Sequence, residues 1–472
     1  MTTLTNDDEV DPNWWKVWRN RRYVVSIMAF FGMLNMYSCR VNLSVAIVAM
    51  TQNSTEPSET TFEWTSGEKG LILSAFYYGY MPLQVFVGVI LRRISAHHVF
   101  GIGIVVPGVI TILTPFFAHN LAILVASRIV MGLFQCVAVP CLMMFWTVWA
   151  PPLERSRLHA ISVSGGFVGT VFALPLSGVL GENFGWESIF YVIGGICVAW
   201  YGLWLILIRA NPEKDRFATE FERNYIKRTI GKQCDAALEA KKSIPWKEIF
   251  TSVPVYGLIL ANFGWGWGYV TMLTQLPQFL SDMMNFDLGK NGFLSALPYL
   301  TMALMSLLAG YLADFFLIRK ILTLNQVRKY YITFSMIIQA GFIITAAYVL
   351  NPYANIICIS LTIGFGAMTY SGLGINYIDI APAFAAVVAG IGNTLGTVPG
   401  IVSPLLTGAI VTSDKSDFEA LQNEWRIVFF ITAAAYLGGA VIYWFFGTAE
   451  TQDWGAFEKC ETKNEEKSDK KV

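Results

Sequence analysis

Long apolar segments are the feature that most constrains how this chain folds. A helix needs about 20 apolar residues to cross the hydrocarbon core of a bilayer, and the sequence contains twelve segments of this kind. Only 14% of the residues are charged and 54% are hydrophobic, whereas a soluble chain averages about 25% charged residues. We therefore expect an all-α integral membrane protein with twelve transmembrane helices, at about residues 23–50, 69–91, 98–118, 121–148, 157–180, 188–209, 252–281, 291–317, 330–350, 354–377, 383–411 and 425–447.

Lysine and arginine set the expected orientation, because cytosolic loops carry an excess of both. With both termini in the cytosol, 27 of the 33 basic residues lie on the cytosolic side and four lie outside. The other two, Arg40 and Arg128, fall inside predicted spans. In this orientation Asn53, which opens the run Asn-Ser-Thr, lies in the first outside loop and is a candidate glycosylation site.

Composition and residue spacing also exclude several functions. The 33 acidic residues balance the 33 basic ones, so bulk charge gives no reason to expect a nucleic-acid partner. The seven cysteines form no CxxC pair, so we expect neither a disulfide framework nor a metal site. All four histidines fall in loops or at span ends, which argues against an enzyme with catalytic groups at membrane depth. Twelve spans in two halves favour a carrier over a channel.

The chain divides into two halves of six spans, because one long polar segment, 210–251, separates them. Glycines of the fifth span, at 165, 169 and 178, recur in the eleventh at 396, 400 and 408. A parallel repeat explains this match, and a chance match between glycine-rich helices is the alternative. The expected parts are a cytosolic tail (1–22), a six-helix bundle (23–209), a cytosolic linker (210–251), a second bundle (252–447) and a cytosolic tail (448–472).

Several motifs resemble a known family. The run Gly310-Tyr311-Leu312-Ala313-Asp314, followed by Arg319 and Lys320, resembles the loop motif of the major facilitator superfamily. The ten residues Trp149 to Leu158 are similar to the loop between helices 4 and 5 of its anion:cation symporter family. That family includes sialin, the vesicular glutamate transporters and the sodium-phosphate transporters. The resemblance implies a major facilitator-type fold and transport of an anion by alternating access.

Charged residues near the loops are candidates for contacts that form in one access state and break in the other. Simple anchoring of the spans by positive charge is the alternative explanation. These gating candidates are Glu154, Arg155, Arg157, Asp314, Arg319 and Asp379.

Two arginines lie where charge is costly. Arg40 lies roughly 25 Å along the first span from its cytosolic end, and Arg128 lies roughly 12 Å into the fourth span from the outside, at about 1.5 Å per residue. An arginine near a helix centre costs about 2.5–3.5 kcal/mol on insertion scales. The interiors of the first six spans contain no acidic residue, so we expect an anion site built from both guanidinium groups. Snorkelling of Arg40, or bonding of either arginine to helix carbonyls, is the alternative. The family resemblance also links both positions to substrate binding or coupling.

Other positions depart from the pattern that the resemblance implies. Gln135, two helical turns after Arg128, stands where the glutamate and sialic-acid branches carry a glutamate. Leu73 and Met143 replace two histidines of the family, and Trp265 stands where the glutamate transporters carry an arginine. A proton relay in a membrane usually needs Asp, Glu or His. We therefore do not expect proton coupling or a vesicular glutamate transporter.

Neutral side chains in the spans complete the candidate substrate site. Asparagine and carbonyl oxygens also suit sodium as a co-transported cation. For Tyr78, Asn262, Trp265 and Asn376, helix–helix packing is the favoured alternative. The candidates are Tyr78, Gln135, Asn262, Trp265 and Asn376.

The expected function is secondary active transport of phosphate or a small organic anion, coupled to sodium or driven by the membrane potential. The alternatives are a proton-coupled lysosomal exporter of sialate or other acidic sugars and an anion sensor that has lost transport. We expect a monomer in the lipid bilayer whose partner is a small anionic substrate, with no cofactor beyond the co-transported cation. The plasma membrane is the expected location, and a lysosomal or vesicular membrane is the alternative.

Overall fold

The computed structural model describes residues 20–51, 62–84, 94–150, 152–228, 244–284, 287–349, 351–382, 384–413 and 417–455. Over these residues the regular structure is helical, and no strand occurs among them. This agrees with the all-α class expected from the sequence. In chain order the longer helices are α1 (Arg21–Thr51), α2 (Ser66–Leu83), α4 (Ala96–Phe117), α5 (Leu121–Gln135), α6 (Ala138–Trp149), α7 (Pro152–Phe184), α8 (Trp186–Leu207), α10 (Trp246–Thr251), α11 (Val253–Met284), α12 (Leu288–Ile318), α13 (Leu324–Tyr348), α14 (Pro352–Ile380), α15 (Ala385–Gly396), α16 (Val398–Ile410) and α17 (Phe418–Phe446).

Helices run through the described parts of all twelve segments that the sequence marks as spans. By length and apolar composition, nine helical stretches of the described chain are able to cross a membrane. The count of twelve spans and the cytosolic placement of both termini stay predictions.

Two predicted spans are each built from a pair of helices. Segment 121–148 contains α5 and α6, and segment 383–411 contains α15 and α16. Pro140 is the third residue of α6, and Pro399 is the second residue of α16. A proline has no N–H to donate to the carbonyl four residues earlier, so it fits a first helical turn but interrupts a helix that runs through it. The prolines explain why both helices restart at these points.

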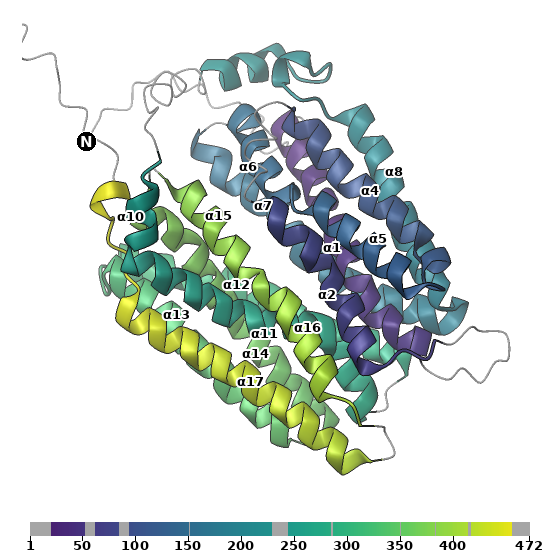
Figure 1. Cartoon of the computed structure of the whole chain (residues 1–472). Helices are drawn as coiled ribbons and strands as arrows, with labels where there is room; N and C mark the ends of the chain where they lie inside the picture. The colour runs from purple at the N-terminus through teal and green to yellow at the C-terminus, as the bar shows by residue number, and fades with distance from the viewer. Residues whose placement is uncertain are drawn as a thin grey trace, which may run out of the picture. The chain divides into compact units, whose positions relative to one another are not determined.

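The described chain falls into two compact units. Unit 1 comprises Met1–Lys242, Met272–Leu300 and Ile401–Glu424, and unit 2 comprises Ser243–Thr271, Thr301–Gly400 and Trp425–Val472. Within unit 1, α1 packs along α7, α2 along α5, and α4 along α8 (Figure 1). Within unit 2, α13 packs along α14. These units are defined by contacts between helices. The predicted division of the chain into two halves of six spans at residues 210–251 stays a prediction.

Two glycines allow close helix contacts within unit 1. A Cβ atom on Gly178 of α7 would lie 2.7 Å from the carbonyl oxygen of Leu288, at the start of α12. A Cβ atom on Gly408 of α16 would overlap the carbonyl oxygen of Ser66, at the start of α2. The two glycines are counterparts in the sequence repeat, and each contacts the first turn of a helix from the other half. This symmetry is consistent with a parallel repeat.

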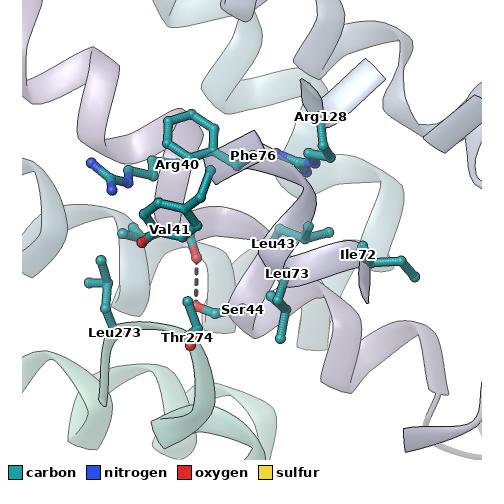
Figure 2. Close-up of a pocket in the computed structure, with 11 residues that line it drawn as sticks. Arg40, Val41, Leu43, Ser44, Ile72, Leu73, Phe76, Arg128, Leu273 and Thr274 are labelled. Carbon is teal, nitrogen blue, oxygen red and sulfur yellow. Dashed lines mark hydrogen bonds between the residues drawn. The ribbon is translucent and has the colours of Figure 1, made fainter. Parts of the chain in front are cut away.

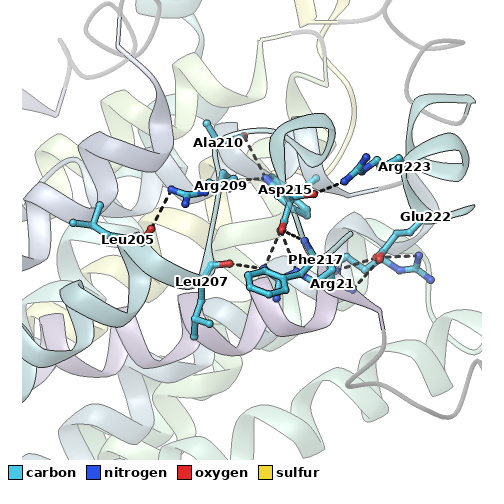
Figure 3. Close-up of polar contacts among 11 residues, drawn as sticks. Arg21, Leu205, Leu207, Arg209, Ala210, Asp215, Phe217, Glu222 and Arg223 are labelled. Carbon is cyan, nitrogen blue, oxygen red and sulfur yellow. Dashed lines mark hydrogen bonds and ion pairs between the residues drawn. The ribbon is translucent and has the colours of Figure 1, made fainter. Parts of the chain in front are cut away.

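The first part of the predicted linker packs against the start of α1 (Figure 3). The Arg21 guanidinium donates to Asp215 Oδ2 from Nε at 3.0 Å and from Nη2 at 2.9 Å, and the Asp215 side chain is fully buried. The Phe217 ring lies 5.2 Å from the Arg21 guanidinium carbon. Glu222 accepts the backbone N–H groups of Arg21 and Arg22 at 2.9 and 3.1 Å. Burial raises the pKa of the Glu222 carboxyl, and these donors oppose that shift.

We expect Asp215→Ala to detach this linker segment, because the change leaves the Arg21 charge buried without its partner. Breaking a buried ion pair in this way costs about 3–5 kcal/mol. Thermal unfolding and limited proteolysis of the purified protein measure the effect as a lower Tm and new cleavage between α8 and α10.

Glu213→Ala is the matched control, since Glu213 pairs with Lys227 in the same segment at 3.2 Å, with side chains 68% and 74% exposed. An exposed pair contributes about 0–1 kcal/mol, so this variant should match the wild type. Equal effects of the two substitutions would contradict the docking role of Asp215.

Candidate functional site

A pocket in unit 1 brings the two intramembrane arginines onto one surface (Figure 2). Its atom-free space is about 370 Å³, including the part that opens to solvent. Residues of α1, α2 and α5 form most of the wall, and two residues of α11 complete it. The lining residues are Arg40, Val41, Leu43, Ser44, Ile72, Leu73, Phe76, Tyr77, Arg128, Leu273 and Thr274.

Local structure on α5 places Arg128 in this wall. The side chain of Asn120 caps the helix by accepting the N–H groups of Ala122 and Ile123 at 3.0 and 3.3 Å, which satisfies backbone donors that a helix start leaves unpaired. One turn beyond Arg128, the backbone at Gly132 approaches the carbonyl of Phe76 so closely that a Cβ atom would overlap it. Close packing of α5 on α2 therefore brings Arg128 toward the pocket.

Arg128 is buried and incompletely bonded. Its side chain is 2% exposed. Nη1 donates to the Cys39 carbonyl oxygen at 3.5 Å, the long limit for an oxygen acceptor, and to Met131 Sδ, a weak acceptor, also at 3.5 Å. Nε and Nη2 are buried and have no hydrogen-bond partner, and no carboxylate among the described residues lies within 4.0 Å. Buried charge without a partner is costly, so an anion beside this side chain would lower its free energy.

Arg40 has a different environment. Its guanidinium carbon lies 4.7 Å from the ring centre of Phe76 and 4.8 Å from that of Tyr77. The rings of Tyr80 and Tyr37 follow at 5.2 and 5.7 Å. Arg40 Nε is buried without a hydrogen-bond partner, and no described carboxylate is within ion-pair distance. Aromatic rings therefore provide the compensation that an acidic side chain would otherwise give.

The sequence interpretation missed these rings. Phe76 and Tyr77 precede Tyr80 on α2 by four and three residues, so each of them is a neighbour of Tyr80 on the helix surface. The candidate Tyr78 lies on the same helix but is not among the residues that line the pocket. The aromatic run from Phe76 to Tyr80 was a visible signal in the sequence, and so was Tyr37, three residues before Arg40.

Gln135 and three candidates in unit 2 make contacts between helices. Gln135 is 1% exposed and donates from Nε2 to the Met36 carbonyl oxygen at 3.2 Å. Asn262 donates to the Gly392 carbonyl oxygen and Trp265 to the Gly366 carbonyl oxygen, each at 3.1 Å. Asn376 donates to the Tyr443 hydroxyl at 2.5 Å. For Asn262, Trp265 and Asn376 these are contacts of the kind that the packing alternative predicted, and Gln135 connects α5 to α1.

The gating candidates are only partly described. The side chains of Glu154, Arg155, Arg157 and Asp314 lie outside the described residues, as does Asn53. Arg319 is exposed, with its guanidinium 5.2 Å from the Phe315 ring.

Asp379, at the end of α14, forms an ion pair within unit 2. Its Oδ2 accepts from Arg328 Nε of α13 at 2.8 Å, and the two side chains are 13% and 8% exposed. Its backbone carbonyl accepts from the Thr451 hydroxyl at 2.9 Å. This places a mostly buried ion pair between two neighbouring helices. The sequence interpretation counted Arg328 only as a cytosolic positive charge.

Comparison with known proteins agrees with this architecture. The model of the Major Facilitator Superfamily matches residues 25–404. Human vesicular glutamate transporter 2 is 35% identical over 467 residues, which cover 96% of this chain and 79% of that protein. Vesicular glutamate transporter 1 of Xenopus laevis is 35% identical over 454 residues, which cover 93% of this chain and 78% of that protein. A crystal structure of a bacterial homologue of the human lysosomal transporter Spinster, inward-facing and occupied, has a TM-score of 0.71 at 13% identity, covering 90% of this chain and 96% of that chain.

The fold and these matches define a membrane transporter of the major facilitator superfamily, to which the chain belongs. Within that superfamily it is a member of the anion:cation symporter family, the family of the vesicular glutamate transporters. The family that the sequence motifs indicated is thereby confirmed. The chain is a multi-pass membrane protein whose relatives are transporters and not enzymes.

We expect Asp379→Asn to destabilise the protein, since it leaves the Arg328 charge unpaired in a mostly buried position. Exchanging the two residues, as Arg328→Asp with Asp379→Arg, should recover part of the lost stability, because the pair reforms. Thermal unfolding of the two single variants and the exchange gives the coupling energy.

Arg319→Ala, which removes an exposed charge, is the control and should leave Tm unchanged. A double variant that unfolds at the temperature expected from simple additivity would show that the pair contributes nothing.

Proposed function

We propose that this protein is a secondary active carrier of phosphate or a small organic anion, working by alternating access. One observation carries the proposal: Arg128 is 2% exposed, faces the pocket and has no carboxylate partner among the described residues. An arginine fork grips a carboxylate or a phosphate with two parallel hydrogen bonds. A bound anion would remove the cost of the buried charge, so the pocket favours an anionic cargo.

Relatives support the anion class. The human and frog proteins are named for glutamate, which is a dicarboxylate at neutral pH. Leu73, an apolar residue, lines the pocket here, and Trp265 uses its indole N–H on a backbone carbonyl. By the family resemblance, Leu73 stands in place of a histidine of the family and Trp265 in place of an arginine of the glutamate transporters. These differences support a substrate other than glutamate.

For the driving force we propose sodium or the membrane potential. Gln135 cannot titrate, and its amide bonds the backbone of α1. None of the residues that line the pocket is Asp, Glu or His. Asp379, an acid near a span end, is already paired with Arg328. A proton pathway through this site therefore has no support among the described residues.

Close glycine contacts support a mechanism of alternating access. Gly178 and Gly408 permit backbone contact at the starts of α12 and α2 within unit 1. Contacts of this kind involve few side chains, so they can form and separate as helices move. We propose that the protein works as a monomer in the plasma membrane, and the names of its relatives support a vesicular membrane as the alternative.

Uptake into proteoliposomes tests the proposed function. Labelled phosphate and a panel of organic anions are supplied with a sodium gradient, a proton gradient or a potential alone. We expect uptake with sodium or potential, loss of uptake in Arg128→Ala, and about tenfold or greater loss of affinity in Arg128→Lys, which keeps the charge but loses the fork.

Arg426→Lys is the control for this experiment, since Arg426 is a partly buried arginine of α17 that donates to the Ala347 carbonyl in unit 2. It should transport like the wild type. Proton-driven uptake would favour the sialate exporter, and absence of uptake by folded protein would favour an anion sensor.

We further expect Gln135→Glu to make transport depend on pH. The new carboxylate lies on the same helix face as Arg128, two turns away, and when ionised it competes with the anion for the guanidinium. Protonation removes that competition, so uptake by the variant should rise as the pH falls. Uptake by wild-type protein should change with pH only as the cargo itself ionises, and a variant profile that matches the wild type would show that position 135 does not sense the site.

A further inference from the structure

The two pocket arginines differ in how their charge is compensated. No ring among the described residues lies over the Arg128 guanidinium at cation–π distance, whereas four rings surround Arg40. We define the aromatic cage as Tyr37, Phe76, Tyr77 and Tyr80. The distances from the Arg40 guanidinium carbon to these ring centres run from 4.7 to 5.7 Å.

The cage is held in place by contacts between its own rings. Phe76 meets Tyr77 edge to face, with centroids 5.3 Å apart, and stacks on Tyr80 at 5.4 Å. Phe76 is 5% exposed and Tyr77 is 2% exposed. Packed rings of this kind lose little freedom when they bind a cation, and burial from water strengthens their attraction for it.

A carrier must balance the positive charge of its binding site both when the site is loaded and when it is empty. In the loaded carrier, the bound anion balances the charge of the arginines. When the site is empty, the arginines must still pass through a closed state from which water is excluded, and an unpaired charge is then most costly. Symporters with a titratable acid can use that acid as the partner. Among the described residues, the pocket lining contains no acid.

We propose that the aromatic cage acts as the counter-charge of Arg40 in the empty carrier and so permits its return across the membrane without a proton. The inference rests on the proposed anion transport. The rings offer their negative faces to the guanidinium, while an arriving anion uses the N–H groups in the guanidinium plane. Cage and substrate therefore do not compete for the same surface of Arg40.

This role makes a specific kinetic prediction. Net uptake requires the empty carrier to return, whereas exchange of internal for external anion proceeds with the carrier loaded in both directions. Weakening the cage should slow net uptake and spare exchange. The ratio of the two rates does not depend on how much folded protein is present, so a purely structural defect leaves it unchanged.

Fluorinated phenylalanine at position 76 is the sharpest test, because Phe76 is the ring nearest to Arg40. Each fluorine withdraws electron density from the ring face and weakens the cation–π attraction, while the shape changes little. In proteoliposomes with labelled phosphate and a panel of organic anions, we expect the ratio of net uptake to exchange to fall stepwise with one, two and three fluorines. The full series should lower it by about threefold to tenfold, the range that one desolvated cation–π contact supports.

Two further variants complete the test. Phe76→Leu removes the ring and should lower the ratio at least as far, and Phe76→Tyr keeps a ring and should recover most of it. The same fluorinated series at Phe31, a phenylalanine of α1 that is 45% exposed and outside the cage, is the control and should leave the ratio unchanged.

The outcomes separate the two proposals. A ratio that stays constant across the Phe76 series, in protein that transports, overturns the role of the cage and leaves the anion carrier standing. Wild-type protein that is folded yet shows neither uptake nor exchange with any anion overturns the proposed function and the cage with it.

Discussion

Burial of positive charge without a carboxylate is the constraint on which the candidate site depends. Water and counter-ions are excluded from the interior of a membrane protein, so a guanidinium there must find compensation in the protein or in a ligand. Arg128 finds almost none, with two long contacts and two unbonded nitrogens. The close packing of α5 on α2 at Gly132 keeps it in this position. Binding of an anion is the simplest way for such a site to lower its free energy.

Arg21 and Arg328, which are buried, and Arg40, which is partly buried, are compensated in two ways. Arg21 and Arg328 are paired with Asp215 and Asp379, each carboxylate being mostly or fully buried. Both pairs connect segments far apart in the sequence. Arg40, on the pocket, is compensated by rings. Ion pairs thus occur where the structure must be held together, and carboxylates are absent from the lining of the pocket, where one would compete with a substrate anion.

Sequence patterns predicted the helical class, the segments in which the described helices lie and the family, because apolar length and loop motifs are local properties. They also singled out Arg40 and Arg128, since a charged residue in an apolar segment is conspicuous. The cage was missed because aromatic residues such as Phe76 are ordinary in a membrane helix, and only the packing of α1 on α2 shows that they meet an arginine. The partners of Asp215 and Asp379 were missed for the same reason, as they depend on tertiary contacts.

The described lining of the pocket contains no titratable acid or histidine, and this has a consequence for the cell biology of the protein. Guanidinium groups keep their charge across the whole physiological range, so the pocket presents the same field to a neutral cytosol, to blood or to the interior of an acidic organelle. Its affinity for an anion would follow the ionisation of the cargo alone. Such a carrier can be moved between membranes by a change in its sorting signals, without any change in its binding site.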